Sequence, residues 1–403
     1  MPALRDGLSL SLIVALPRVG LSVLLDDDLR AAQLPLFAEG IVDAVEWTVD
    51  LEMGRAAPPW VSPLLDAYAD AGALYGHGVH LSPLSAAWEA RQSEWLDAAR
   101  AIAQRRNLVH LSEHFGVMTA PGFSRGAPLP LPSSSAVTQV GRDRLARLAD
   151  AVERPIGVEN LALSMSRRDA LAHGDQIAAL VEGSERFVVL DLHNLFCQAA
   201  SFDIAPDDLL RRMPLDRVRE IHVSGGSVAR SQDDPRARPF RRDTHDGPLP
   251  SEVFDLIGPA IDACANVEVV LLERLGGTFA AAGSIARYQD DYRRMRSIVH
   301  GASRGSAGPL QGSAQTVVQG RSLPLAADDV NSHEAEIASL AVLQLAWIGA
   351  LHEATTVDEV VARLRAAPIE PAHHAWALGF DRRAVEVAMA VAKRWVRALG
   401  DEG

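Results

Sequence analysis

The sequence predicts an α/β protein: a (β/α)8 TIM barrel followed by a linker and a small all-α C-terminal domain. Three observations favour it. Up to about residue 300, short aliphatic or β-branched runs alternate with longer amphipathic segments, which is typical of parallel strands joined by helices. Eight such runs can be counted, the number that closes a barrel. A stretch rich in Gly, Ser, Ala and Gln then precedes further helical segments, so we expect a metal-binding catalytic barrel over residues 1–300, a flexible linker over 301–325 and a helical domain over 326–403.

The strands are expected where the aliphatic runs lie. In chain order they are Leu8–Val14, Ala44–Thr48, Leu74–Leu81, Leu108–Ser112, Pro155–Asn160, Phe187–Leu192, Val218–Val223 and Val267–Glu273. The first run resembles a short signal-peptide core, but no clear small-residue cleavage site follows it. Its Leu-Ser-Leu-Ser alternation favours a strand instead.

Helices are expected between the strands and after the linker. Those of the barrel include Leu84–Arg106, Gly141–Val152, Arg168–Glu182, Asp207–Arg212 and Ser251–Cys264. Those of the C-terminal domain are Ser332–Leu351, Val357–Ala366 and Asp381–Leu399. Thr356 and Glu359 have the spacing of a capping box that would open the second of these.

Composition restricts the partners. The 403 residues carry a formal charge of −13, which disfavours binding to nucleic acid or anionic lipid because both require a basic surface. No stretch approaches the roughly 20 uninterrupted apolar residues of a membrane span. Cys197 and Cys264 lie far apart and form no CxxC pair, so we expect two ordinary buried thiols in a reducing cytoplasmic compartment.

Potential metal ligands recur at or just beyond the C-terminal ends of the predicted strands, where α/β barrels build their active sites. They are Glu46, His77, His114, Glu159, Asp191, His193, Asn194, His222 and Glu273, with Asp243 and His245 in the loop after the seventh strand. Any one of these alone is more often an ordinary hydrogen-bonded residue. So many carboxylates in one cavity would repel one another without cations, so the sequence predicts a polynuclear metal site. The mixed ligand set suits iron or manganese, with zinc also open.

The same motifs resemble the DUF692 family of multinuclear non-haem iron-dependent oxidative enzymes, over about residues 5–299. The runs that carry the resemblance are His77-Gly-Val-His-Leu-Ser82, Ser112-Glu113-His114-Phe115, Glu159-Asn160, Asp191-Leu-His193-Asn194, Glu220-Ile-His222, Asp243-Thr-His245-Asp246 and Glu273. The chain departs from the family pattern at Glu113, where Asp is common, at Leu161, where Pro is common, and at His193, where Asn is common. The last change touches a possible ligand and bears on the number of irons.

The resemblance implies two or three iron ions, dioxygen as co-substrate, and oxidative modification of cysteine residues in a ribosomally synthesised precursor peptide. It implies the ligand set His77, His114, Glu159, Asp191, His222, Asp243, His245 and Glu273, with His193 or Asn194 as a further ligand. Within it we expect Glu159, Asp243 and His245 to act in catalysis and Glu159 to bridge two metals. Family members usually rely on a separate protein that presents the peptide. The C-terminal helices lie outside the resemblance and are either an ordinary bundle or a unit that replaces or docks that partner.

Other functions remain open on the residues alone. A zinc-dependent phosphodiesterase or a divalent-metal sugar isomerase would also place His, Asp and Glu at barrel strand ends. A non-catalytic metal- or peptide-binding protein would hold metal without consuming oxygen. Among nearby residues, we expect His80 to line the pore, His110 to be structural and Glu46 to orient a ligand through a hydrogen bond.

Overall fold

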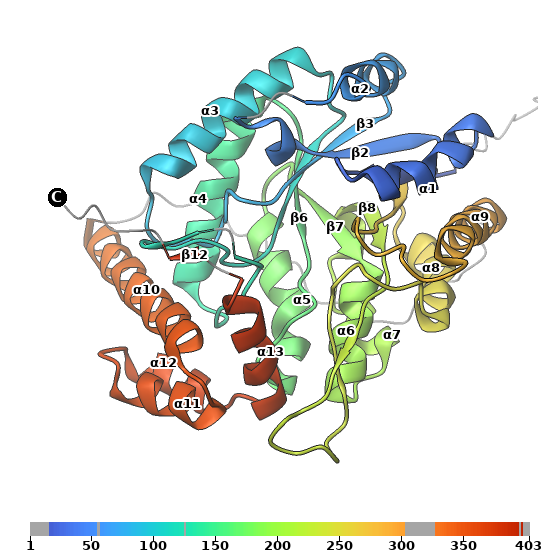
Figure 1. Ribbon diagram of the computed structural model, residues 1–403. Coiled ribbons are helices and arrows are strands. Elements are labelled where there is room, and N and C mark those ends of the chain that lie inside the picture. The colour runs from blue at the N-terminus through green and yellow to red at the C-terminus, as the bar shows by residue number, and fades with distance from the viewer. Residues whose placement is uncertain (1–15, 55–56, 125, 303–326, 395, 398–403) are drawn as a thin grey trace, which may run out of the picture.

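Eight parallel strands form a closed barrel in the computed structural model, which describes residues 16–54, 57–124, 126–302, 327–394 and 396–397 (Figure 1). The strand order around the barrel is β1-β11-β8-β7-β6-β4-β3-β2. The bounds are β1 Arg18–Val23, β2 Ala44–Thr48, β3 Leu74–Gly78, β4 Leu111–His114, β6 Ile156–Glu159, β7 Phe187–Asp191, β8 Val218–Val223 and β11 Val269–Leu272. The predicted fold class is therefore confirmed.

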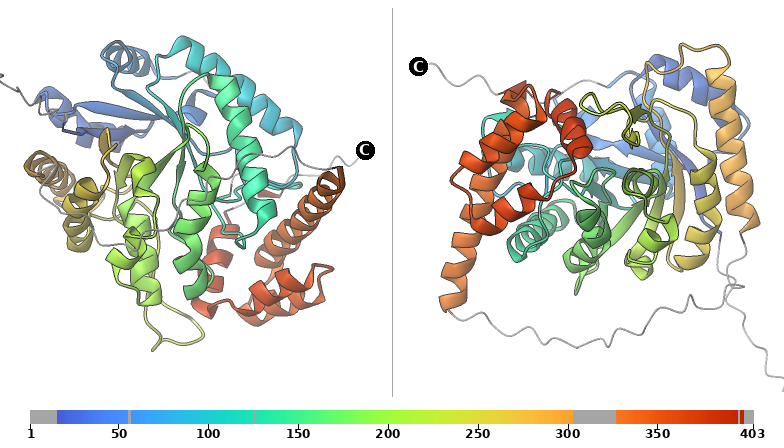
Figure 2. Two further views of the ribbon diagram at one scale, coloured as in Figure 1. Left: turned by 180° about the vertical axis from the view of Figure 1, so that it is seen from behind. Right: turned by 90° about the horizontal axis from the view of Figure 1, so that it is seen from below.

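Helices surround the barrel on the outside (Figures 1 and 2). They are α1 Asp27–Ala38, α2 Val61–Asp70, α3 Ala90–Arg105, α4 Ser135–Val152, α5 Arg167–Val181, α6 Leu192–Phe202, α7 Pro206–Leu210, α8 Ser251–Ala263 and α9 Ser284–Gly301. Ser134 and Ser166 cap α4 and α5 through their side chains, as expected for helices that begin after a serine. Short 3-10 helices lie at Val49–Glu52 and Leu215–Arg217.

The first strand was predicted in the wrong place. Leu8–Val14 lies outside the described residues, and the strand that closes the barrel is β1, Arg18–Val23. β1 pairs in parallel with both β2 and β11, so its position is set by two neighbouring strands rather than by its own alternation.

The barrel interior changes from apolar to polar toward the C-terminal strand ends. Ala44, Tyr75, Val269 and Leu271 form a small buried cluster inside the barrel, apart from the main core. Two residues further along three of these strands stand Glu46, His77 and Glu273. Because side chains on one face of a strand recur every second residue, these polar groups point into the same interior, one layer above the apolar cluster.

The C-terminal helices are α10 Ala327–Glu353, α11 Val357–Ala366, α12 Pro371–Leu378 and α13 Arg382–Ala392. The predicted helix Asp381–Leu399 ends earlier, and the short strand β12, Val396–Arg397, pairs with β5, Phe123–Ser124. Figure 2 shows these helices against one side of the barrel. The predicted linker 301–325 lies almost entirely outside the described residues, and the domain boundaries stay a prediction.

Helix α10 contains a segment, Glu334–Glu353, that is long and apolar enough to span a membrane by length and composition. Here it packs along α4, and Leu343, Trp347 and Leu351 are fully buried. The Gln344 amide accepts from the Ala86 backbone N–H at 2.9 Å and donates to the Leu84 carbonyl at 2.6 Å. Packing against α4 of the barrel and against α11 and α13 of the C-terminal unit therefore buries part of the apolar surface of this helix, and Trp347 contacts the rings of Trp376 and Phe380.

Candidate metal centre

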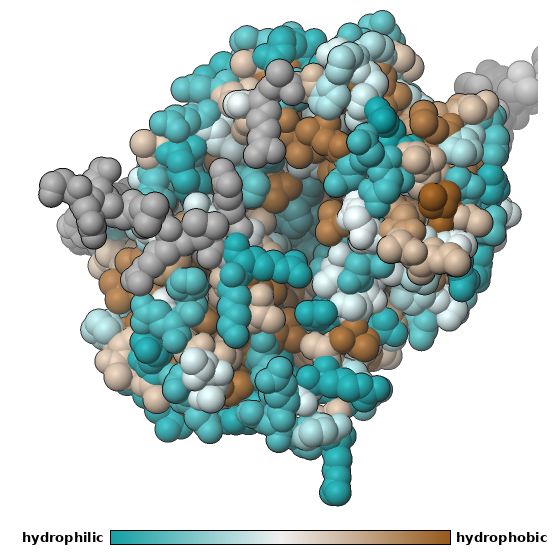
Figure 3. All heavy atoms as spheres, in the orientation of Figure 1, coloured by the Kyte–Doolittle hydropathy of each residue, from teal (hydrophilic) through white to brown (hydrophobic). Residues whose placement is uncertain are grey.

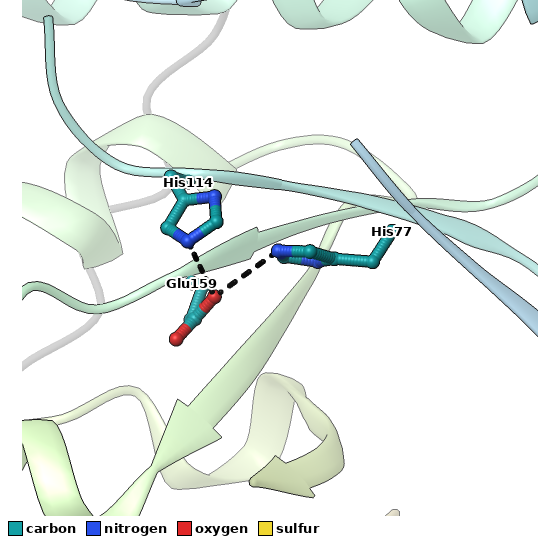
Figure 4. Close-up of side chains that lie close together, drawn as sticks. All are labelled: His77, His114 and Glu159. Atoms are coloured by element: carbon teal, nitrogen blue, oxygen red, sulfur yellow. Dashed lines mark ion pairs between the residues drawn. The ribbon is translucent and has the colours of Figure 1, made fainter. Parts of the chain in front are cut away.

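A first group of side chains meets at the ends of β3, β4 and β6 (Figure 4). His77 Nε2 and His114 Nε2 each lie 3.5 Å from Glu159 Oε2. His77 and Glu159 are buried, whereas the His114 side chain is 21% exposed. These three residues offer two imidazole nitrogens and one carboxylate oxygen to a common point, and all three ligand atoms lie within 4.8 Å of one another.

A second group shares Glu159 with the first. One ligand atom from each of Glu159, Asp191, His222 and Glu273 lies within 4.8 Å of the others, and all four residues are buried. His222 Nδ1 is 3.3 Å from Glu273 Oε2 and 4.0 Å from Glu159 Oε1. Asn194 joins this group because its Nδ2 donates to Glu159 Oε1 at 3.1 Å.

A third group lies next to Glu273. Asp243 Oδ1 is 3.1 Å from His193 Nδ1 and 2.8 Å from His245 Nε2, and His245 Nε2 is 3.9 Å from Glu273 Oε2. His193 stands in the first turn of α6, which Asp191 caps by accepting from the Asn194 N–H. His245 has φ +49°, a left-handed conformation that costs a non-glycine residue free energy and is common at functional sites.

A layer of polar residues lies beneath these groups and orients them. Glu220 Oε1 lies 2.9 Å from His222 Nε2, and the other oxygen of Glu220 contacts His110 Nε2. The Ser112 hydroxyl lies 2.8 Å from His77 Nδ1. Glu46 Oε2 lies 3.1 Å from His222 Nε2. Such contacts fix the ring orientation and tautomer of a histidine whose other nitrogen faces a metal.

Several polar atoms of this region are buried and have no partner in hydrogen-bonding geometry among the described residues, although some of them lie within ion-pair distance of a neighbour. They are Asp191 Oδ2, Asn194 Oδ1, His222 Nδ1 and Glu273 Oε2, together with both oxygens of Glu46. An unsatisfied buried carboxylate oxygen is costly. Four of these atoms belong to residues of the second group, and oxygen and imidazole nitrogen donors that face one another suit a hard or borderline cation such as iron, manganese or zinc. The residues present therefore fit a bound metal.

Burial and neighbouring charges shift the pKa values of these groups in different directions. Burial raises the pKa of Asp191 to about 8, helped by the charges of Asp243 and Glu273, and raises the pKa of Glu46 to about 7. Burial lowers the pKa of His77 to about 3. Burial also opposes protonation of His245, but the charge of Asp243 outweighs it and holds the pKa of His245 at about 10. A bound cation would favour the deprotonated forms of the three proposed ligands among them, Asp191, His77 and His245.

A pocket opens over the centre and includes His114, Asn194 and Asp243 in its wall. Figure 3 shows a hollow near the middle of this face, with hydrophilic and hydrophobic side chains around it. Apolar walls come from the loop after β6, through Leu161 and Leu163, and from α13. The metal-type ligands can therefore be reached from outside through one opening shared by the barrel and the C-terminal helices.

All ten residues predicted as ligands lie in these three groups, and their role as ligands stays a proposal. His110 is buried against Glu220, and Glu46 contacts two of the histidines, in the positions predicted for them. The His80 ring hydrogen-bonds Asp50 at 3.1 Å. Sequence reasoning missed the orienting role of Glu220, although the Glu-x-His spacing places both side chains on one strand face. It also missed the pocket residues Arg241, Arg242 and those of α13.

Fold and site together define a (β/α)8 barrel with a candidate polynuclear metal centre at its C-terminal strand ends. Residues 49–286 match the family model described as RiPP precursor modification enzyme MbnB/TglH/ChrH, where RiPP denotes a ribosomally synthesised and post-translationally modified peptide. The chain belongs to this family, and the resemblance drawn from the motifs is confirmed.

Relatives named UPF0276 protein support the same assignment. The one from Acaryochloris marina is 28% identical over 231 residues, which is 54% of this chain and 80% of the relative. One from Caulobacter vibrioides is 27% identical over 194 residues, 48% of this chain and 66% of the relative.

Solved structures with a similar chain path are more distant. Endonuclease IV from Thermus thermophilus has a TM-score of 0.42 and 17% identity, covering 71% of this chain and 100% of that one. The IolI protein with a bound zinc atom has a TM-score of 0.46 and 12% identity, covering 71% and 99%. The barrel assignment rests on the closed strand order of the chain itself.

Proposed function

We propose that this protein uses two or three iron ions and dioxygen to modify cysteine residues of a ribosomally synthesised precursor peptide oxidatively. The observation that carries the proposal is the linkage of the three ligand groups. Glu159 belongs to the first and second groups, and Glu273 lies between the second and third. Carboxylates that touch two sets of ligands can bridge neighbouring cations, which is how a polynuclear centre forms without thiolates.

The proposed ligands follow from this arrangement. His77, His114 and Glu159 would hold one metal, and Glu159, Asp191, His222 and Glu273, with Asn194 beside them, a second. His193, Asp243 and His245 would hold a third. Iron would supply the one-electron steps that reaction with dioxygen requires. Glu159, Asp243 and His245 are the proposed catalytic residues because they combine ligand chemistry with positions at or next to the pocket.

The residues of the chain itself would hold, orient and shield the reacting groups. Ser112 and Glu220 fix the rings of His77 and His222. The pocket wall of Leu161, Leu163 and Val387 would limit the access of water to the substrate thiol. Cys197 and Cys264 are buried, and burial raises the pKa of both thiols, which suits passive core residues rather than reacting thiolates. We propose a cytoplasmic location, where substrate cysteines stay reduced.

The decisive experiment is elemental analysis of protein purified without oxygen, followed by optical spectra before and after air is admitted. We expect two or three irons per chain and a ferric band that develops with oxygen uptake. Glu159→Gln should lower the iron content and abolish oxygen uptake with a cysteine peptide. Glu185→Gln, an exposed carboxylate away from the centre, is the matched control.

Two outcomes would contradict the proposal. Stoichiometric zinc with no spectral response to air would favour a hydrolase or isomerase on the same barrel. Iron that is bound but never consumes oxygen in the presence of any cysteine peptide would favour a carrier protein.

A further inference from the structure

We infer that the pocket over the metal centre binds a peptide segment with a carboxylate group close to the modified cysteine, and that arginines of both the barrel and the C-terminal unit recognise it. This inference rests on the proposed function for the presence of a cysteine peptide. It adds the charge of the substrate and a role for the C-terminal unit.

Three arginines line the pocket: Arg241 and Arg242 from the segment before Asp243, and Arg394 two residues after the end of α13. None of them forms an ion pair with a carboxylate of the described residues. The Arg241 guanidinium stacks on the Phe196 ring at 5.0 Å. Arg242 Nη2 donates to the Ser227 hydroxyl at 2.8 Å, while its Nε is buried with no hydrogen-bond partner.

The three pocket arginines lack the carboxylate partners that two neighbouring arginines have. Elsewhere on α13 and near it, Arg382 pairs with Asp233 and Asp358, and Arg383 pairs with Asp381. The acidic residue of the pocket, Asp243, is already engaged by two histidines. The three guanidinium groups therefore remain available to an anionic ligand, and a planar guanidinium matches a carboxylate through two parallel hydrogen bonds.

The shape of the opening favours a peptide over a small compact ligand. A second hollow adjoins the first, and Arg242, Val387 and Ala390 line both. It continues along α13 as far as Thr355 and Thr356. An extended chain could thus run from the metal centre along α13, with apolar contacts to Val387 and Val391 and ionic contacts to the arginines.

Contacts with the barrel fix the position of α13, so the residues of α13 that line the pocket are held in place. Glu386 accepts from the Ser231 hydroxyl at 2.8 Å and from the Gln232 N–H at 3.3 Å, which ties α13 to the segment between β8 and the third ligand group. Figure 1 shows α13 beside the barrel, between α10 and α6. The C-terminal unit therefore supplies one wall of the active-site pocket and does not merely pack against the outside of the barrel.

The test is the binding of short synthetic cysteine peptides to the full-length protein, followed by fluorescence anisotropy. The peptides share one sequence and differ in charge: a neutral peptide with an amidated C-terminus, one with glutamate beside the cysteine, one with a free C-terminal carboxylate, and one with lysine beside the cysteine. We expect at least one carboxylate peptide to bind about tenfold or more tightly than the neutral one, and the preference to weaken with salt. The favoured peptide shows whether a side chain or the chain end provides the carboxylate.

Substitutions of the arginines test whether they cause the preference for carboxylate peptides over the neutral peptide. Arg242→Gln should reduce the ratio of the two affinities about tenfold. Arg394→Gln should reduce it by less, because Arg394 is exposed and screened by water. Arg365→Gln, an exposed arginine on α11, should leave it unchanged. Because Arg394 lies on the surface, its variant tests the inference even if Arg242→Gln does not fold.

Equal affinity for all four peptides, no binding of any up to about 1 mM, or a charge preference that survives when Arg242→Gln and Arg394→Gln are combined would overturn the inference. These outcomes are separable from failure of the proposed function, because binding needs no turnover. A charge preference in a protein that holds zinc would contradict only the iron chemistry. Iron and oxygen uptake without a charge preference would contradict only the inference.

Discussion

Gly226 lies against the ring of His193, and its missing side chain makes room for the third ligand group. A Cβ atom added there would lie 2.8 Å from His193 Cε1 and would also overlap the Arg242 carbonyl oxygen. Arg242 directly precedes Asp243, so two of the three ligands of this group depend on the close approach of this backbone. A single methyl group can therefore disturb the site without removing any ligand.

We expect Gly226→Ala to lower the bound metal by up to one ion per chain, because His193 and Asp243 would move apart. Elemental analysis measures it. The matched control is Gly258→Ala in α8, where an added Cβ meets nothing within 4 Å and alanine should stabilise the helix by about 0.5–1 kcal/mol. Full metal content in Gly226→Ala would show that the third group does not require this packing.

The buried imidazole of His173 is hydrogen-bonded to the loop that follows Glu159. The Leu161 backbone N–H donates to His173 Nε2 at 2.9 Å, which requires this nitrogen to carry no proton. Burial lowers the pKa of His173 to about 4. The unfolded chain takes up a proton near pH 6.5 while the folded chain does not, so stability is lost as the pH falls from about 6.5 to about 4.

Urea unfolding at a series of pH values tests this assignment. We expect His173 to contribute about 3 kcal/mol to the fall in the free energy of unfolding over that interval. His173→Gln should flatten the profile, whereas His300→Gln on the exposed end of α9 should not. Parallel profiles for the wild type and His173→Gln would contradict the assignment.

At the scale of elements, the C-terminal helices are joined to the barrel by specific polar contacts as well as apolar packing. Gln344 on α10 satisfies two backbone groups of the segment after β3, at Leu84 and Ala86. Next to them, the Ser85 and Ser82 hydroxyls contact one another at 2.8 Å, and Ser82 accepts from the Met118 N–H. One helix thereby supports the loops that follow β3 and β4.

Replacing Gln344 with leucine should leave the Ala86 N–H and the Leu84 carbonyl buried without partners. We expect Gln344→Leu to lower the free energy of unfolding by about 2–4 kcal/mol in urea denaturation. Leu345→Ala is the control, because that side chain is 41% exposed and should change stability little. A variant as stable as the wild type would show that water replaces the amide.

For the whole molecule, metal binding and folding stability should be coupled. Glu46, Glu159 and Asp191 are buried close together, and burial raises the pKa of each. The unfolded chain has no preformed site, so any metal that binds the folded centre stabilises it.

We expect chelation to lower the thermal unfolding midpoint and ferrous iron, added without oxygen, to restore it. A metal concentration a hundredfold above its dissociation constant would contribute about 2.7 kcal/mol. Glu159→Gln should respond less because a shared ligand is lost. Identical midpoints with and without metal would show that the centre does not bind cations.

The sequence by itself determined the barrel and the candidate ligands. Eight regular runs specify parallel strands, and the C-terminal ends of such strands meet at one end of a barrel, so His77, Glu159 and Glu273 had to converge whatever the helices between them do. The same logic failed for Leu8–Val14, because alternation alone does not specify which run pairs with β2 and β11.

Only the tertiary structure decided how the ligands divide into three groups and what surrounds them. The links through Glu159 and Glu273 depend on side-chain distances that no spacing in the sequence encodes. The wall formed by α13 and the meeting of Arg394 with Arg242 depend on how the C-terminal helices dock. Docking arises from complementary packing between residues more than a hundred positions apart, which leaves no periodic pattern along the chain.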